Sequence, residues 1–428
     1  MRKYVSFIVK DSEQFKKQLL FYLKKHQISA IYDSCNYKSS QSYSAYDFIA
    51  GFEALQTFTG GLQKVKEAFD LGDWALGYLA YDLKNELEHI YSVNHDGLQF
   101  ENTSFFQPRF LFLCNSNSWQ FSYLDDCDTE AQVLSIIDEI KNVVTEEHEN
   151  KSIKIKQRVN KTAYLKSVKG VLDHIHRGDI YEMNYCMEFY AEHTKIDPFS
   201  IYKSLHSVSP TPFSSFFKMK DKHIICASPE RYICKRAQQV ITQPIKGTAK
   251  RSADIEVDKA NKSKLKESIK EQSENIMIVD LVRNDLSKIA ERGSVKVDEL
   301  CGIYPFKQVF QMISTVSAKL NHSNTAFDVI KATFPMGSMT GAPKLRATKL
   351  IEKYEETKRG AYSGAMGYIT PNQDFDFNVI IRSILYNSAQ EYLSFMVGSA
   401  ITAKSNPVEE YEECLLKAKA IFEVLRAK

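Results

Sequence analysis

The sequence predicts a protein of the mixed α/β or α+β class, built on large β-sheets. Of its 428 residues, 43% are hydrophobic, which supplies enough apolar side chain for a large core or two fused lobes. Runs with strand-like alternation recur along the chain, and segments with helical periodicity lie between them. This order of elements is typical of sheets covered by helices.

The first part of the chain contains both kinds of element. The segment SEQFKKQLLFYLKKH has the apolar spacing of an amphipathic helix, and WALGYLAYDL is continuous enough for a buried strand. The predicted elements are a strand at 4–9, a helix at 12–26, a further strand, a helix near 61–70, strands at 74–83, 109–114 and 121–126, and a helix at 130–144. The polar stretch 145–156 resembles a linker, so we place a sequence boundary near residue 150, between regions 1–150 and 151–428.

The second region opens with a helix in which apolar side chains recur at helical spacing until Gly178 ends it. Between 249 and 270 nearly every residue is charged or small, which predicts a mobile segment that leads into a long helix at 266–293. The other predicted elements are strands at 213–219, 223–228, 231–235 and 309–320, a helix at 325–334, a helix that ends at Tyr354, strands at 361–370, 375–386 and 391–397, and a closing helix from Pro407.

The bulk composition excludes several classes of function. Lysine and arginine number 56 against 53 acidic residues, so the net charge of +3 creates no general attraction for nucleic acid or membranes. The eight cysteines form no CxxC pair and no cluster with histidine at zinc-ligand spacing. No run approaches the roughly 20 apolar residues of a membrane-spanning helix, and the N-terminus lacks a secretory pattern. We therefore expect a soluble, cytoplasmic protein, in which any anionic ligand must be held by local cations.

Two acidic pairs lie at helical spacing. Glu271 and Glu274 share one face of a predicted helix, and Glu410 and Glu413 share a face of another, with Lys417 four residues further on. One interpretation is two solvated helix faces. The other is that the two helices converge and that the carboxylates hold a hard divalent cation such as Mg²⁺.

Two glycine-containing loops could present backbone N–H groups to an anion. The loop GSMTGAPK at 337–344 lacks the spacing of a nucleotide-binding phosphate loop, but it lies at the start of a predicted helix. The segment VGSAIT, which contains Gly398, Ser399 and Ala400, offers a similar cradle after a strand. Either could equally be an ordinary tight turn.

Three isolated charged residues are candidates for chemistry. Taken alone, Glu230 and Lys246 are more typical of surface residues. Arg382 lies inside the apolar run NVIIRSILY, so it should either form a structural ion pair or bind a ligand carboxylate. A nucleophilic lysine needs desolvation or a cationic neighbour, because with an ordinary pKa near 10.4 only about one molecule in two thousand is neutral at pH 7.

Taken together, these segments resemble the chorismate-binding enzymes, and within that family the aminodeoxychorismate synthases. The matching blocks occur in the family's order and cover about residues 160–425. They are GDIYEMNYC, SPERY, PIKGT, ENIMIVDLVRNDL, FPMGSMTGAPK, RGAYSGAMGYI, FNVIIRSI, VGSAIT and PVEEYEECLLKAKAI. A weaker likeness extends to WALGYLAYDL. The resemblance implies a fold in which two sheets pack against each other with helices outside.

The resemblance implies that Lys246 is the nucleophile. Anthranilate synthases of the same family carry alanine at this position, whereas aminodeoxychorismate synthases carry lysine. The family implies that Lys246 attacks C2 of chorismate as the 4-hydroxyl departs, and that ammonia then adds at C4 and expels the lysine. The product would be 4-amino-4-deoxychorismate, a precursor of 4-aminobenzoate and folate.

The resemblance also assigns substrate contacts. Glu230 matches the acid that protonates the departing hydroxyl, and Tyr362 and Arg382 match residues that hold the enolpyruvyl carboxylate. The other substrate-binding positions that it implies are Gly247, Thr248, Gly398, Ser399, Ala400 and Lys417.

The cofactor that the resemblance implies is Mg²⁺. Glu274 and Glu413 match its ligands, and Glu271 and Glu410 match their supporting partners. The ion would screen the ring carboxylate of chorismate and orient it.

Three positions depart from the family pattern. Gln311 stands where many relatives have histidine, so a histidine proton donor is not expected. Glu182 stands where isochorismate-forming and salicylate-forming relatives have a lysine that activates water, which argues against water as the nucleophile. Ala400 replaces a common glycine in the cradle.

The resemblance implies a partner as well. We see no glutamine-hydrolysing domain and no lyase domain in this sequence, so we expect ammonia from a separate glutaminase subunit. Two other functions remain open: anthranilate synthase component I, and a non-catalytic regulatory subunit that binds chorismate or tryptophan. A tryptophan site near YDSC at 32–35 would follow the family.

Overall fold

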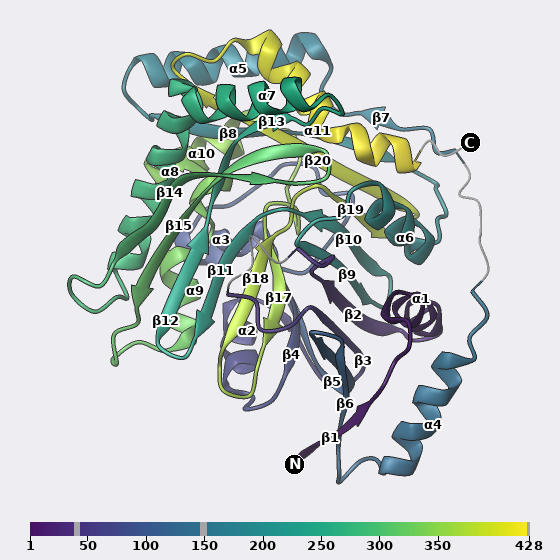
Figure 1. The fold of residues 1–428 in the computed structure, drawn as a ribbon. Helices are drawn as coiled ribbons and strands as arrows, with labels where there is room; N and C mark the ends of the chain where they lie inside the picture. Colours follow the sequence, from purple (N-terminus) through teal and green to yellow (C-terminus); the bar gives the residue numbers. More distant parts are fainter. Residues whose placement is uncertain (38–42, 146–151, 426–428) are drawn as a thin grey trace.

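The computed structural model describes residues 1–37, 43–145 and 152–425. Antiparallel strands dominate it, and helices lie on the outside (Figure 1). The strands are β1 (Arg2–Phe7), β2 (Ile28–Asp33), β3 (Phe48–Gly60), β4 (Ala75–Leu79), β5 (Thr103–Asn115), β6 (Ser118–Leu124), β7 (Lys156–Gln157), β8 (Glu182–Ala191), β9 (Phe213–Met219), β10 (Lys222–Ser228), β11 (Arg231–Arg236), β12 (Gln239–Gln243), β13 (Ile245–Lys250), β14 (Lys296–Pro305), β15 (Val309–Lys319), β16 (Gly341–Ala342), β17 (Ala365–Ile369), β18 (Phe375–Val379), β19 (Ser383–Asn387) and β20 (Tyr392–Thr402). The helices are α1 (Ser12–Leu23), α2 (Leu62–Asp70), α3 (Lys84–Glu88), α4 (Glu130–Lys141), α5 (Lys161–His176), α6 (Pro198–Val208), α7 (Ile255–Glu267), α8 (Ile269–Ser287), α9 (Ala326–Thr333), α10 (Lys344–Tyr354) and α11 (Pro407–Leu425), with short 3-10 turns η1 (Tyr81–Leu83) and η2 (Gly337–Met339).

The strands form two layers that share the long strand β5. The first layer has the order β1–β6–β5–β3–β2–β9–β10–β19–β20–β8. The second runs from β5 through β4, β17, β18, β11 and β12 to β15, and β13 and β14 also pair with β15. Each of these pairings is antiparallel, so the sheets can be built from hairpins and short connections.

The two layers face each other across a buried core. The hydroxyl of Tyr32 on β2 donates to the carbonyl of Gly367 on β17 at 2.6 Å. Asn378 on β18 donates to the hydroxyl of Ser215 on β9 at 3.1 Å. The buried side chains between the strands are mainly aromatic and aliphatic. The predicted two-sheet core is confirmed.

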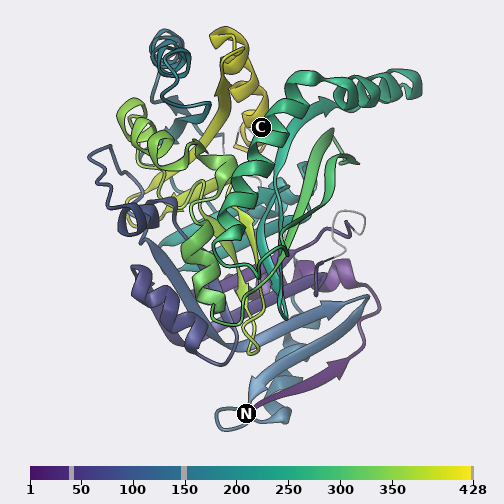
Figure 2. The same ribbon diagram turned by 90° about the vertical axis from the view of Figure 1, so that its left-hand side faces the viewer.

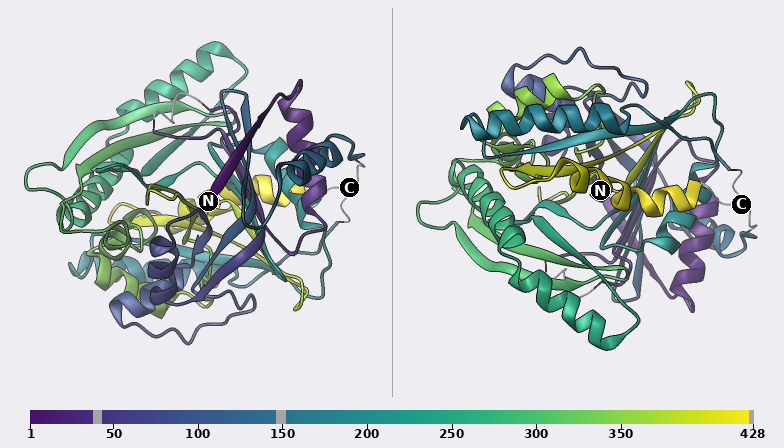
Figure 3. Two further views of the ribbon diagram at one scale, coloured as in Figure 1. Left: turned by 90° about the horizontal axis from the view of Figure 1, so that it is seen from below. Right: turned by 90° about the horizontal axis from the view of Figure 1, so that it is seen from above.

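Helices cover the outer face of the first layer around a second core. Phe15 on α1 packs edge-on against Trp119 on β6, with 4.9 Å between the ring centroids. Tyr164 on α5 packs against Tyr411 on α11 at 5.2 Å, and Figure 3 shows these two helices over the strands when the molecule is seen from above. The predicted outer helices are confirmed as well.

The regions before and after residue 150 both contribute strands to both layers. Strand β2 pairs with β9, and β4 pairs with β17. The boundary predicted near residue 150 lies outside the described residues. These pairings show that strands from before this boundary form hydrogen bonds with strands from after it.

Two predicted segments differ in the structure. The polar stretch that we expected to be mobile contains α7, whose first turn is capped by the side chain of Asp254, and α8 begins separately after the cap of Ser268. Figure 2 shows α7 and α8 following each other along one side of the molecule. The strand predicted at 375–386 is divided into β18 and β19, because Arg382 between them has a left-handed backbone with φ of 53°.

Candidate active site

One cavity of about 980 Å³ gathers nearly all the residues singled out from the sequence. Strand β13, helix α8, turn η2, strand β20 and helix α11 contribute to its wall. The predicted residues that line it are Glu230, Lys246, Gly247, Thr248, Glu271, Glu274, Tyr362, Arg382, Gly398, Ala400, Glu410, Glu413 and Lys417. Residues separated by more than 180 positions in the sequence therefore share one wall.

Ser399 is the predicted residue that does not line this cavity. Successive side chains of a strand point to opposite faces, so Gly398 and Ala400 of β20 face the cavity and Ser399 faces the other way. Its hydroxyl is 3.2 Å from that of Tyr164 on α5. Ser399 therefore packs β20 against the outer helices.

Lys246 lies where strand β13 bulges. The pairing of β13 with β15 shifts register between Ile245 and Thr248, and Gly247 within the bulge has φ of +93°. A side chain at Gly247 would also meet Glu271, since an added Cβ would lie 3.1 Å from Oε2 of Glu271. Glycine at this position thus lets the lysine turn into the cavity beside α8.

The ammonium of Lys246 is buried and paired with Glu182 at the start of β8. Nζ of Lys246 donates to Oε1 of Glu182 at 2.7 Å, and the side chains are 11% and 1% exposed. Burial by itself lowers the pKa of Lys246, but Glu182 and the more distant Glu274 and Glu230 overcome this effect and raise it. In the resting protein the lysine is therefore a charged member of a buried pair, and not the surface residue that its local sequence permits.

Glu230 lies between β10 and β11 and is 4% exposed. Burial raises its pKa to about 7, although a hydrogen bond with Ser338 and the charge of Lys246 oppose the rise. A carboxyl with this pKa is protonated in about half of the molecules at neutral pH. Glu230 can therefore donate a proton near neutral pH.

The two acidic pairs face each other from α8 and α11. Lys270 on α8 joins them, since its Nζ is 3.9 Å from Oε1 of Glu274 and 3.6 Å from Oε1 of Glu410. Burial raises the pKa of Glu271, and the charge of Glu413 raises it further. The interpretation as two separate solvated faces is therefore wrong, because the helices converge on the cavity.

The chemistry of these four carboxylates fits a hard divalent cation. Glu274 is 8% exposed, and its Oε1 has no hydrogen-bond partner within the described residues. Burial, together with the charge of Glu271, raises the pKa of Glu274 to about 7. A cation would stabilise the ionised form of this group and supply a partner for the free oxygen.

The carboxylates do not already form a coordination shell. In the described part of the chain, no three acidic, cysteine or histidine residues are arranged as ready metal ligands. Glu410 accepts a hydrogen bond from Ser405 at 2.7 Å, and Glu413 pairs with Lys417 at 2.6 Å, which lowers the pKa of Glu413. A metal ion bound here would have to replace some of these contacts.

A guanidinium group faces the cavity without a partner. No hydrogen bond or ion pair joins the side chain of Arg382, which lines the cavity, to any other described residue. Burial lowers its pKa, while the nearby Tyr362 and Glu413 act in the opposite direction. The structural ion pair considered for Arg382 is absent from the described residues, so this group is available to a ligand carboxylate.

The glycine-rich loop at 337–344 contributes side chains to the cavity, whereas the N-terminus of the helix that follows it does not serve as an anion site. Ser338 and Met339 of turn η2 line the cavity. Lys344 at the start of α10 instead bonds to Asp285 and donates to the carbonyl of Thr333 at 3.0 Å. The start of α10 is therefore occupied by structural contacts.

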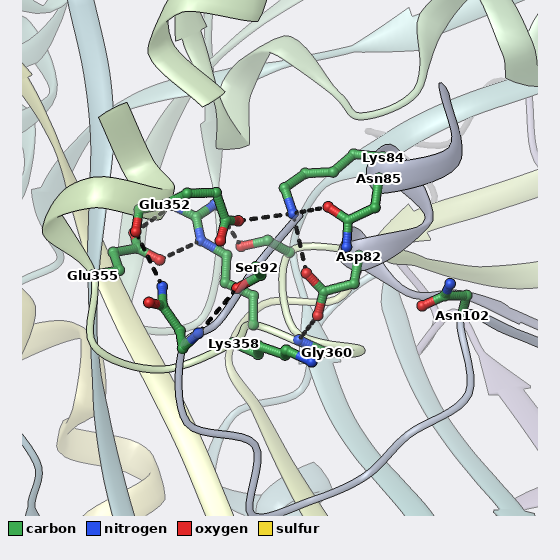
Figure 4. Close-up of polar contacts among 12 residues, drawn as sticks. Asp82, Lys84, Asn85, Ser92, Asn102, Glu352, Glu355, Lys358 and Gly360 are labelled. Carbon is green, nitrogen blue, oxygen red and sulfur yellow. Dashed lines mark hydrogen bonds and ion pairs between the residues drawn. The ribbon is translucent and has the colours of Figure 1, made fainter. Parts of the chain in front are cut away.

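A buried ion-pair network fixes the segment that precedes Tyr362. The side chain of Lys84 is fully buried, and its Nζ lies 3.1 Å from Asp82 and 2.8 Å from Glu352. Asp82 in turn accepts a hydrogen bond from the backbone of Gly360 at 3.0 Å (Figure 4). Through these contacts the region before residue 90 holds one wall of the cavity.

Arg359 extends this network to two other walls. It donates two hydrogen bonds to Glu355, at 2.9 and 2.6 Å. It also donates to the carbonyls of Met339 at 2.7 Å and Asn184 at 2.9 Å. Met339, Asn184 and Tyr362 all line the cavity, so one buried guanidinium fixes their relative positions.

Sequence reasoning missed several residues of the site. Lys270, Ser338 and Asn184 line the cavity but were not proposed as functional. Gln311 on β15 also lines it, and its Oε1 is buried without a hydrogen-bond partner within the described ranges. Lys270 could have been found from the sequence, because it lies four residues before Glu274 on the same helix face.

The chain is similar to known proteins in sequence and in fold. The family described as chorismate binding enzyme matches residues 8–423. The chain is 30% identical to aminodeoxychorismate synthase component 1 of Bacillus subtilis over 88% of this chain and 81% of that protein. It is 31% identical to anthranilate synthase component 1 of Thermus thermophilus over 82% and 77% of the two chains.

Among solved structures, the fold is similar to that of anthranilate synthase component I from Streptococcus pneumoniae. The TM-score is 0.79 at 24% identity, over 87% of this chain and 91% of that one. Within the described residues, no helix combines the length and apolar character that crossing a membrane requires.

Proposed function

The chain belongs to the family of chorismate-binding enzymes, and we propose that it aminates chorismate at C4 to 4-amino-4-deoxychorismate, for the synthesis of 4-aminobenzoate and folate. The observation that carries this proposal is the buried amine of Lys246 in the same cavity as Glu230. An amine and a proton donor with a pKa of about 7 are the two groups that this substitution needs. The similarity to aminodeoxychorismate synthase component 1 over most of both chains supports the same reaction.

The first half of the proposed reaction forms a covalent bond between Lys246 and C2 of chorismate. The neutral amine supplies the electron pair, the two conjugated ring double bonds shift, and the C4–O bond breaks. Glu230 donates its proton to the departing oxygen, so water leaves. Splitting the substitution in this way replaces one difficult displacement by two allylic steps.

In the second half, ammonia bonds to C4 and the bond from C2 to Lys246 breaks. The electron pair of the broken bond returns to the lysine, the two double bonds shift back, and Glu230 regains a proton from solvent. Because the amine leaves as a neutral group, Lys246 is ready for another turnover.

Chorismate is a dianion, and the cavity offers positive groups at separate places. We assign Arg382, with Tyr362 beside it, to the enolpyruvyl carboxylate, and Lys417 to the same wall. Glu274 and Glu413 would hold Mg²⁺, supported by Glu271 and Glu410. When bound, the ion supplies positive charge that neutralises and orients the ring carboxylate.

The ammonia would come from a separate glutaminase subunit. The Bacillus subtilis relative is named as a component 1, and a name of that kind implies a second component. Free ammonia would replace the subunit in an assay, so the chemistry of this chain can be tested by itself.

The decisive experiment is mass spectrometry of the products formed from chorismate, ammonia and Mg²⁺. We expect 4-amino-4-deoxychorismate from the wild type and none from Lys246→Ala. Lys259→Ala, an exposed change on α7, is the control and should keep full activity. Anthranilate as the main product would contradict the proposal, and so would an unchanged turnover in Lys246→Ala.

A further inference from the structure

Lys246 can act as a nucleophile only after its ammonium has lost a proton. The groups that face it carry mostly negative charge, which holds the proton in place. They are Glu182 on β8, Glu230 before β11, Glu271 and Glu274 on α8, and Glu413 on α11. A chorismate dianion in the cavity would add to this effect, so the proposed chemistry needs a specific acceptor for the proton.

Glu182 is the one acidic residue in direct contact with the ammonium. Its Oε1 is 2.7 Å from Nζ, whereas no other carboxylate in the described ranges forms an ion pair with Lys246 within 4.0 Å. A proton transfer along this hydrogen bond requires no movement of heavy atoms.

Glu182 is also held rigidly. It pairs in register with Thr402 of β20 on one side and with Ala342 of β16 on the other. Its side chain is 1% exposed, and its second oxygen, Oε2, has no hydrogen-bond partner among the residues described. The carboxylate therefore has one oxygen on the ammonium and a second oxygen that no described donor occupies.

We propose that Glu182 is a positioning residue that aims the amine of Lys246 and accepts its proton when the bond to C2 forms. This inference rests on the proposed function. The N–H bond of the ammonium breaks, its electron pair stays on nitrogen, and the proton moves to Oε1 of Glu182, which leaves a neutral amine beside a neutral carboxylic acid. When ammonia has added at C4 and the amine is released, the proton returns and restores the ion pair.

The proposal is distinguishable from a structural ion pair by the pH dependence of Glu182→Gln. In the wild type the proton stays within the pair, so kcat does not require its loss to solvent. In Glu182→Gln the proton must go to solvent, so kcat gains a requirement for the neutral lysine. The ratio of the variant's kcat to the wild-type kcat should therefore rise about tenfold for each pH unit below the pKa of the lysine.

The measurement is kcat at saturating chorismate and a fixed concentration of neutral ammonia, from pH 6.5 to 8.5. Taking the ratio cancels the titration of Glu230, which both proteins share. We expect Glu182→Gln to be roughly 100-fold slower at pH 7, with a deficit that shrinks as the pH rises. Glu182→Asp should recover part of the rate with a wild-type profile, and Glu256→Gln on the exposed face of α7 should match the wild type.

A second readout is the pKa of Lys246, from NMR of labelled lysine without substrate. Glu182→Gln should lower this pKa, because burial remains and the main opposing charge is gone. A deficit in kcat that is the same at every pH would overturn the proposal, and so would an unchanged rate in a variant whose Lys246 pKa has fallen. If the wild type forms no aminated product, the proposed function fails first, and the NMR result still tests the pair.

Discussion

The ammonium of Lys270 on α8 lies 3.6 Å from the carboxylate of Glu410 on α11. Nearby carboxylates raise the pKa of this lysine against the effect of its burial. Lys270 thus neutralises part of the charge that a divalent cation would neutralise.

We predict that Lys270→Ala binds Mg²⁺ more tightly than the wild type. Removal of a competing positive charge about 4 Å from the ligands favours the ion, by several-fold to about tenfold for a half-exposed lysine. Isothermal titration calorimetry measures this, with Lys259→Ala as the control on the neighbouring helix. Weaker binding in Lys270→Ala would mean that the lysine helps to build the site.

Glu274 should make the metal-free protein less stable as the pH rises. Its folded pKa of about 7 is above the ordinary value of 4.5, so the folded state binds the proton more tightly and loses stability from about pH 4.5 up to pH 7. We expect Glu274→Gln to raise the free energy of unfolding at pH 8 by about 1–3 kcal/mol without metal. The same variant should gain less stability from Mg²⁺.

Urea unfolding in a chelator, at pH 5 and pH 8, is the measurement for Glu274→Gln. Glu256→Gln, on an 82% exposed side chain, is the matched control and should not change the pH dependence. Equal stability of Glu274→Gln and the wild type at pH 8 would show that the carboxylate is not penalised by burial.

We predict that kcat for amination falls as the pH rises above neutral, because Glu230 must be protonated to act. Because burial raises its pKa to about 7, the fraction that can donate a proton decreases tenfold per pH unit above that value. Glu230→Gln should be about 100-fold to 10,000-fold slower and should lose this decline. The check is kcat against pH at a fixed concentration of neutral ammonia. If kcat of Glu230→Gln still fell at alkaline pH, the titrating group would be a residue other than Glu230.

Gly247→Ala should impair activity more than its backbone strain explains. Both Gly247 and Gly293 have a left-handed backbone, with φ of +93° and +77°, but nothing lies within 4 Å of a Cβ built on Gly293. Each alanine should cost about 1–2 kcal/mol from strain. Only Gly247→Ala also pushes against Glu271, so chorismate turnover should fall in that variant alone. If both variants turned over chorismate at the same rate, the bulge at Gly247 would have no role in catalysis.

Arg382→Met should weaken chorismate binding without lowering stability. The arginine has no partner within the described residues, so its removal leaves no unpaired acid, whereas a charge-assisted bond to a ligand contributes about 1.5–3 kcal/mol. We expect KM to rise roughly 10-fold to 150-fold. Arg231→Met is the contrast, since Arg231 is buried and paired with Asp376 at 2.9 Å. That change should destabilise the fold by about 3–5 kcal/mol.

Several features of the site followed from local patterns in the sequence. Helical spacing placed Glu271 with Glu274, and Glu410 with Glu413, on common faces. The position of Lys246 among ordered blocks predicted a nucleophile, and this role stays a prediction. The period of two along a strand could also have shown that Ser399 faces away from Gly398 and Ala400, since that alternation holds wherever the strand is placed.

The sequence by itself determined which residue types were present and which of them shared a face, because both depend on fixed distances along one element. Only the tertiary structure decided which faces meet: α8 against α11 through Lys270, and β13 against β8 through Lys246 and Glu182. These contacts depend on strand pairings and packing between distant segments, which are selected by the burial of the whole core and not by local spacing.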